Sequence, residues 1–242
     1  MENAPQRYVA HLDILGMRVL THRDHREAWH MLSALEIALK RSTQITIVAE
    51  DFDGPIHVPE LVRSVVFSDT IVLYSEADLP RDFRAIFTAA LNLFGQAMYL
   101  RVPIRIGISK GTFYSDEQRS MYAGPALIEA YDIGEKSQWL GIVLSDAVAK
   151  DAITHDMRKG NSRIVVDWDV PNKEGTLRAS VANWPVALEH NFKIEPPITP
   201  QQLYSIFEEY YGPFVSLHES VAAKYINTVK FINAQYALHK HT

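Results

Sequence analysis

The sequence predicts an α/β (α+β) sandwich, in which helices flank a central, mainly antiparallel sheet and a helical extension follows at the C-terminus. Two observations support this prediction. Apolar runs of strand length alternate with amphipathic helical segments in the order β-α-β-β-α-β along the first part of the chain. One strand pair is joined by a tight hairpin, whereas the other strands are joined by helices. This order is typical of a ferredoxin-like sandwich.

The first four elements follow from periodicity and turn residues. Residues Arg7–Leu15 form an apolar run that ends at Gly16, which predicts a buried strand. A helix is expected next, because apolar residues recur at helical spacing at Ala28, Met31, Leu32, Leu35, Ala38 and Leu39. Turn formers at Glu50–Pro59 predict a loop. Two β-branched runs then flank Ser68 and Asp69, which predicts a hairpin.

The same criteria carry the prediction through the middle of the chain. A helix is expected over Pro80–Met98, since its apolar residues share one helical face. The remaining predicted elements are a strand at Pro103–Ser109, a helix at Ala123–Lys136, a strand at Gly141–Ser145, and short strands near Ser162–Asp167 and Thr176–Val181.

The last 47 residues read as a separate helical piece, so we divide the chain into a catalytic domain at 1–195 and an extension at 196–242. Thr199 to Gln202 has the pattern of a capping box, with proline at the first helical position. One helix should run to about Tyr211 and a second should fill Phe214–His239. Docking of this second helix on its own domain is the favoured interpretation, and a dimer contact is the alternative.

Composition excludes several classes of protein. The formal net charge is −5, which argues against a nucleic-acid-binding protein. No apolar run approaches the roughly 20 residues that cross a bilayer, and no secretory signal pattern begins the chain. The chain has no cysteine, so disulfides and thiolate metal sites are ruled out. We therefore expect a cytoplasmic protein with no membrane partner.

Two aspartates interrupt apolar strands. Asp13 lies near the end of the first strand, and Asp69 lies at the turn of the hairpin. A carboxylate among core residues is costly unless it is paired or binds a cation. Taken separately, Asp69 fits an ordinary turn residue and Asp13 fits a cap for the following helix. In the predicted topology, however, the first strand and the hairpin are neighbours, so the two carboxylates could converge and hold divalent metals.

Such a pair suits phosphoryl transfer. Two metal ions about 3.5–4 Å apart can activate the attacking oxygen and neutralise the leaving group. Oxygen ligands favour Mg²⁺ or Mn²⁺. The turn at Gly16 would offer backbone N–H groups to phosphates.

The sequence resembles the class III nucleotidyl cyclases. The motifs that carry the resemblance are Asp13-Ile14-Leu15-Gly16, Phe67-Ser68-Asp69, Arg105 to Gly111, and Gly124 to Ala130. The resemblance covers roughly residues 7–150. It implies that Asp13, Asp69 and the Ile14 carbonyl hold two Mg²⁺ or Mn²⁺ ions. It also implies that the backbone of Leu15, Gly16 and Met17 binds phosphates.

Within this family the chain is most similar to the pyrimidine cyclases of bacterial Pycsar antiphage defence, whose motifs look like HLDILG, FSDTIVLY, RIGISKG and GPALIEAY. That resemblance implies UTP or CTP as the substrate and a cyclic nucleotide such as cUMP as the product. It further implies a homodimer with active sites at the subunit interface. A separate effector would sense the product.

The chain departs from the family pattern at several positions. Val65 stands where purine cyclases usually have a base-binding lysine, and Met121 stands where an aspartate is expected. Ile128 and Asp132 align with the asparagine and arginine that stabilise the transition state. A working cyclase therefore needs another cation, for which the candidates are Arg105, Lys110 and Arg101.

We assign Arg105 the catalytic role, with a structural ion pair inside the sheet as the alternative. Two other functions remain open. One is an adenylate or guanylate cyclase with unusual base contacts. The other is a degenerate cyclase-like module that only binds a nucleotide or a partner, which the missing asparagine and arginine would favour.

Overall fold

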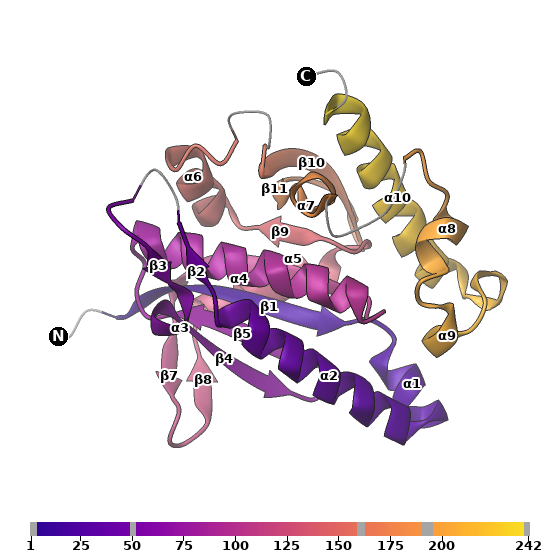
Figure 1. Cartoon of the computed structure of the whole chain (residues 1–242), viewed down its shortest axis with the longest axis horizontal. Coiled ribbons are helices and arrows are strands. Elements are labelled where there is room, and N and C mark those ends of the chain that lie inside the picture. The colour runs from indigo at the N-terminus through magenta and orange to yellow at the C-terminus, as the bar shows by residue number, and fades with distance from the viewer. Residues whose placement is uncertain (1–3, 49–51, 159–162, 190–195, 240–242) are drawn as a thin grey trace.

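A seven-stranded sheet forms the centre of the computed structural model, which describes residues 4–48, 52–158, 163–189 and 196–239 (Figure 1). Across the sheet the strands are β10 (Val165–Asn172), β11 (Gly175–Ala182), β9 (Ile142–Leu144), β6 (Ile104–Thr112), β1 (Gln6–Ile14), β5 (Thr70–Ser75) and β4 (Val62–Phe67). Only the pairing of β6 with β9 is parallel within this sheet. The predicted fold class is confirmed: the strand order β4-β5-β1-β6 is the ferredoxin-like order.

Helices cover both faces of the sheet. The helices before the C-terminal extension are α1 (Met17–Arg23), α2 (His25–Thr43), α3 (Val58–Leu61), α4 (Pro80–Tyr99), α5 (Pro125–Lys136), α6 (Asp146–Thr154) and α7 (Trp184–Ala187). Alternate β1 residues point to opposite faces. Tyr8, Ala10 and Leu12 join the main core with α2 and α4, whereas Val9 packs with α5.

The helix α5 lies unusually close to β6. A Cβ atom added at Gly107 of β6 would lie 2.1 Å from the carbonyl oxygen of Ala130 in α5. Gly134, also in α5, faces the Gly107 backbone at 3.1 Å from such a Cβ atom. Gly107 of the Arg105–Gly111 motif therefore permits the close packing of α5 on β6.

Several local predictions were wrong. The helix predicted from Ala28 to Leu39 is confirmed as α2, which starts where the Asp24 side chain accepts hydrogen bonds from Arg26 N and Glu27 N at 3.0 Å, but the short helix α1 before it was not predicted. The predicted loop at Glu50–Pro59 includes β3 (Ile56–His57), which pairs with β2 (Thr46–Ile47), although Glu50 and Asp51 lie outside the described residues. We did not predict α6, or the hairpin of β7 (Tyr114–Asp116) and β8 (Met121–Ala123). The strand predicted near Ser162–Asp167 begins at Val165, and Ser162 lies outside the described residues.

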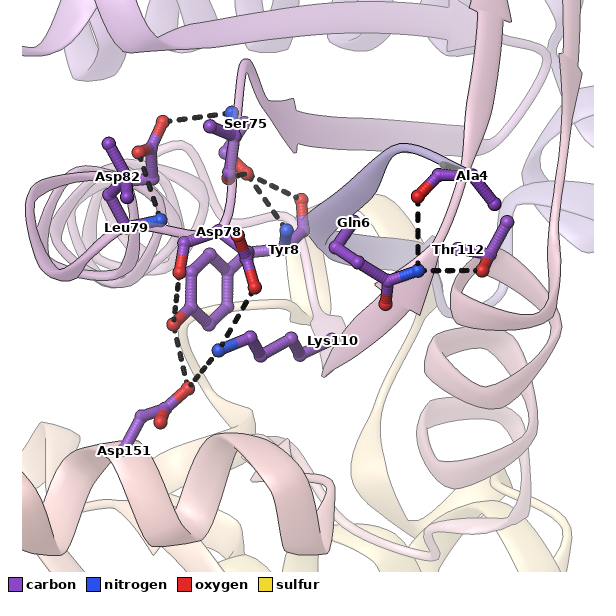
Figure 2. Close-up of polar contacts among 11 residues, drawn as sticks. Ala4, Gln6, Tyr8, Ser75, Asp78, Leu79, Asp82, Lys110, Thr112 and Asp151 are labelled. Atoms are coloured by element: carbon purple, nitrogen blue, oxygen red, sulfur yellow. Dashed lines mark hydrogen bonds and ion pairs between the residues drawn. The ribbon is translucent and has the colours of Figure 1, made fainter. Parts of the chain in front are cut away.

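A partly buried polar network fastens β1 and β6 to neighbouring elements. The Tyr8 hydroxyl donates to Asp151 Oδ2 at 2.7 Å, and Lys110 Nζ lies 3.1 Å from the same oxygen and 3.5 Å from Asp78 Oδ2 (Figure 2). Asp82 accepts hydrogen bonds from the Ala77 and Leu79 amides and so caps α4. These contacts tie α6 and the turn before α4 to the sheet.

The C-terminal extension packs on the rest of the chain, which agrees with the expected docking of its last helix on its own domain. It contains α8 (Pro200–Tyr204), α9 (Glu208–Tyr211), a 3₁₀ turn at Phe214–Ser216, and α10 (Glu219–His239). The predicted capping box is present, with Gln202 N donating to Thr199 Oγ1 at 3.3 Å. The single helix predicted up to Tyr211 was wrong, because the chain turns after Tyr204 and buries Phe207 against Tyr225 of α10.

The extension shares the main hydrophobic core. Phe231 of α10 packs against Trp139 and Trp168, with ring centroids 4.8 and 5.2 Å away. The boundary proposed at residue 195 lies outside the described residues, so the division into two domains stays a prediction. Across the described ranges, every helix is too short or too polar to span a membrane.

Candidate active site

The two predicted metal ligands lie at the same end of the central strands. Asp13 is near the C-terminal end of β1, where it pairs in register with Thr70 of β5 and with Arg105 of β6. Asp69 immediately precedes Thr70 in the β4–β5 turn, and its carbonyl accepts a hydrogen bond from Ile14 N at 3.1 Å. The convergence expected from the sequence therefore holds for the backbone that carries both aspartates.

Arg105 forms a buried ion-pair cluster on this sheet end. Its Nε and one terminal nitrogen each lie 2.7 Å from Asp13 Oδ2. The same terminal nitrogen pairs with the Glu135 carboxylate of α5, and the other donates to the carbonyls of Glu135 and Ser137 at 2.6 and 3.0 Å. Lys173, at the β10–β11 turn, also pairs with Glu135. Each guanidinium nitrogen of Arg105 thus has an acceptor, and the side chain is buried.

Burial and the neighbouring charges shift the pKa of Glu135 in opposite directions. Burial raises the pKa of Glu135, but the hydrogen bond from Lys173 and the nearby Arg105 outweigh it, so the pKa lies below the usual value. Asp13 and Glu135 thus flank Arg105 in one compact ion-pair cluster.

His11 was missed by the sequence analysis. It lies two residues before Asp13 on β1, so both side chains point to the same face. It is buried, and its ring meets Tyr131 of α5 edge-on at 5.2 Å between centroids. Burial lowers the pKa of His11, although Asp13 raises it, so the imidazole is neutral at pH 7. The two-residue spacing from Asp13 was the signal that could have found it.

The carboxylates retain oxygens that could bind a divalent metal. Both contacts from Arg105 reach a single oxygen of Asp13, and the Asp69 carboxylate has neither hydrogen bond nor ion pair to a residue in the described ranges. Those ranges contain no group of three or more histidines or acids placed to hold a metal. Two carboxylates and the Ile14 carbonyl suit Mg²⁺ or Mn²⁺, which keep water and substrate oxygens in their shells.

The turn after β1 differs in part from the predicted phosphate cradle. Gly16 adopts φ +78°, which favours glycine, and starts α1. The Leu15 amide already donates to the Pro103 carbonyl at 2.8 Å, and Met17 is buried. Tyr211 of α9 lies against Gly16, since a Cβ atom there would be 2.8 Å from the tyrosine ring.

The other candidate cations lie elsewhere. Lys110 pairs in register with Tyr8, five residues before Asp13 on β1, which places it about 17 Å away along the strand. Arg101 forms an ion pair with Glu209 of the extension. Ile128 and Asp132 lie exposed on α5, with Ile128 63 % exposed.

Comparison with solved structures identifies the fold. The chain is 14 % identical to the catalytic core of a rhodopsin-guanylyl cyclase with converted specificity in complex with ATPαS, with a TM-score of 0.52 over 74 % of this chain and 95 % of that one. This likeness shows that the chain has the fold of a class III cyclase core.

Two further solved structures match the chain with lower TM-scores. One is a class III adenylyl cyclase-like ATP-binding protein from Pseudomonas aeruginosa (16 % identity, TM-score 0.45, 61 % of this chain), of which the chain spans 34 %. The other is an adenylate/guanylate cyclase/hydrolase from Silicibacter pomeroyi (18 % identity, TM-score 0.43, 74 % of this chain and 97 % of that one). No protein-family model and no curated protein matches the chain.

Proposed function

We propose that the chain is a nucleotidyl cyclase that converts UTP or CTP to the 3′,5′-cyclic monophosphate and pyrophosphate. The observation that carries the proposal is the meeting of Asp13 and Asp69 at one end of the central strands, with carboxylate oxygens left for a metal. The fold of a class III cyclase core is consistent with it.

In the proposed reaction, a bond forms between the ribose O3′ and the α-phosphorus. The bond from that phosphorus to the β-phosphate oxygen breaks, its electron pair leaves with pyrophosphate, and the 3′-hydroxyl proton goes to solvent. Mg²⁺ or Mn²⁺ bound by Asp13, Asp69 and the Ile14 carbonyl would supply charge neutralisation and acidify the 3′-hydroxyl. The protein needs no nucleophile, because positioning and electrostatics supply most of the rate enhancement in phosphoryl transfer.

Arg105 has two roles open to it in this proposal. As a positioning residue it holds Asp13 through a hydrogen bond and an ion pair to Oδ2. To act as the predicted catalytic cation, it would have to exchange one of its protein acceptors for a phosphate oxygen. The positioning role needs no such exchange.

The pyrimidine preference, the homodimer and the effector come from the motif resemblance. Val65 lies in the middle of β4 and Met121 in β8, and as apolar side chains neither offers the polar group with which purine cyclases bind the base. The product would be a cytoplasmic second messenger of antiphage defence, sensed by a separate effector.

Product formation tests the proposal. Purified protein is incubated with UTP, CTP, ATP or GTP, with Mn²⁺ or with EDTA, and products are separated by chromatography. We expect a cyclic pyrimidine monophosphate that requires metal, and we expect Asp69→Ala to fold normally and make none. Cyclic product from ATP or GTP alone would instead indicate the purine cyclase. Full activity of Asp69→Ala would contradict the two-metal mechanism.

A degenerate binding module is the second candidate. The observation that favours it is the engagement of Asp13 by Arg105, together with Ile128 and Asp132 at the positions of the transition-state pair. This candidate predicts that nucleotide binds, measured by calorimetry, without turnover in any metal.

A further inference from the structure

The C-terminal helix α10 is fastened to the segment that holds Arg105. Asn227 Nδ2 donates to the Gln138 carbonyl at 2.9 Å, and Leu140 N donates to Thr228 Oγ1 at 2.8 Å. The Ser137 carbonyl, one residue before Gln138, accepts a hydrogen bond from Arg105. These bonds fix α10 beside the end of the sheet that carries Asp13.

Lys224 lies on the same side of α10, three and four residues before Asn227 and Thr228. It is half-buried, and the charges that act on it are those of Arg105, Asp13, Glu135 and Lys173. Burial and Arg105 lower the pKa of Lys224, whereas Asp13 and Glu135 oppose that change. Lys224 forms no ion pair with a residue of the described segments, since Glu135 is taken by Arg105 and Lys173.

The other part of the extension covers the Gly16 turn. Tyr211 of α9 lies against Gly16, and its hydroxyl contacts Met31 of α2 at 3.5 Å from the sulfur. Glu209, also in α9, pairs with Arg101. Figure 1 shows α8 and α9 beside the end of β1 and above α1. The extension thus borders the candidate active site from α9 to α10.

Among the described cations around Asp13, Arg105 and Lys173 are already engaged by carboxylates. Arg105 already has an acceptor on each nitrogen, and the family's transition-state pair is replaced by Ile128 and Asp132. We propose that Lys224 of the C-terminal helix contacts the β- and γ-phosphates of the nucleotide, which makes the extension part of the active site. This inference rests on the proposed cyclase function. A lysine ammonium is a compact charge that binds phosphate oxygens from a flexible stem.

The chemical role follows from the charge that develops. When the bond between the α-phosphorus and the β-phosphate oxygen breaks, negative charge accumulates on the departing pyrophosphate. An ammonium group held there stabilises the transition state more than the ground state. Its removal should therefore weaken both turnover and the binding of free pyrophosphate.

Matched variants of α10 test the assignment in the full-length protein. Lys224→Gln removes the charge, Lys224→Arg keeps it, and Lys230→Gln removes a charge from an exposed position on the same helix. We expect Lys224→Gln to lower kcat/KM for the preferred nucleotide about 100-fold. Inhibition by pyrophosphate should weaken about 10-fold. Lys224→Arg should recover at least part of both losses, and Lys230→Gln should match the unaltered protein.

The outcomes separate the two proposals. An unaltered protein that makes no cyclic product overturns the cyclase function, and the role of Lys224 with it. An active protein in which Lys224→Gln and Lys230→Gln behave alike overturns the role of Lys224 alone. If Lys224→Gln does not fold, Lys224→Met keeps the aliphatic stem and takes its place. Loss of turnover with unchanged pyrophosphate inhibition would also overturn phosphate contact.

Discussion

At the scale of single residues, the site depends on an arginine buried between two carboxylates. A buried charge is tolerated only when hydrogen bonds replace its hydration. Arg105 meets this condition through Asp13, Glu135 and two carbonyls. The sequence could place Asp13 and Asp69 together, because strand order and a hairpin turn determine their backbone positions. It could not place Glu135, because that contact depends on how α5 crosses the sheet.

Removing the Glu135 charge should destabilise the fold in a pH-dependent way. Because the folded-state pKa of Glu135 is lowered, its contribution is present above the pKa of the unfolded glutamate, about 4.3. We expect Glu135→Gln to cost about 2 kcal/mol at pH 7, since it removes hydrogen bonds between charged groups. The difference from the unaltered protein should shrink as the pH falls below about 4 and through the folded-state pKa.

Urea unfolding followed by circular dichroism between pH 7 and pH 3 measures this difference. Glu174→Gln is the control, because Glu174 is 74 % exposed and its pair with Lys136 spans 3.5 Å. A difference for Glu135→Gln that stays constant over the whole pH range would contradict the lowered pKa.

At the scale of elements, helices with a strong apolar face were predicted within a few residues. The predicted helix Pro80–Met98 is α4 at Pro80–Tyr99, because its buried face and its proline at the first turn leave few alternatives. The extension was predicted less well. Its break after Tyr204 depends on the burial of Phe207 under α10, which is a tertiary contact that periodicity does not contain.

The close crossing of α5 over β6 should make Gly107 intolerant of any side chain. We expect Gly107→Ala to destabilise the protein by about 3 kcal/mol, because its Cβ would lie 2.1 Å from the Ala130 carbonyl and force α5 away from the sheet. Gly111→Ala in the same strand should stay within about 1 kcal/mol, because its nearest neighbour, the Ala126 Cβ, would be at 3.7 Å. Thermal unfolding of both variants measures the difference, and equal stabilities would show that α5 can shift without cost.

At the scale of the whole molecule, the two ends of the central strands have different roles. At one end, Tyr8, Lys110 and Asp151 close a polar network that ties α6 to the sheet (Figure 2). At the other, Asp13 and Asp69 retain unpaired oxygens beside the C-terminal extension. Within the described ranges, Phe67 also lies exposed (79 %) near this second end, and Ile128 lies exposed (63 %) in the first turns of α5.

A subunit interface of the predicted homodimer would need exposed apolar residues of this kind. Phe67 ends β4 just before the turn that carries Asp69, and Ile128 lies on the helix α5 that supplies Glu135. The predicted homodimer, with active sites at the subunit interface, would bury both side chains. We therefore expect Ile128→Glu to weaken self-association at least 10-fold, because a charge at the centre of an interface must be desolvated.

Sedimentation velocity over a range of protein concentrations measures the effect, and cyclic-nucleotide formation is followed in the same samples. Ile153→Glu is the matched control, because Ile153 is 54 % exposed on α6. If the active site needs both subunits, the activity of Ile128→Glu should fall in parallel with its dimer fraction and recover at high protein concentration. A monomeric protein with full activity would show that one copy of the chain holds a complete site.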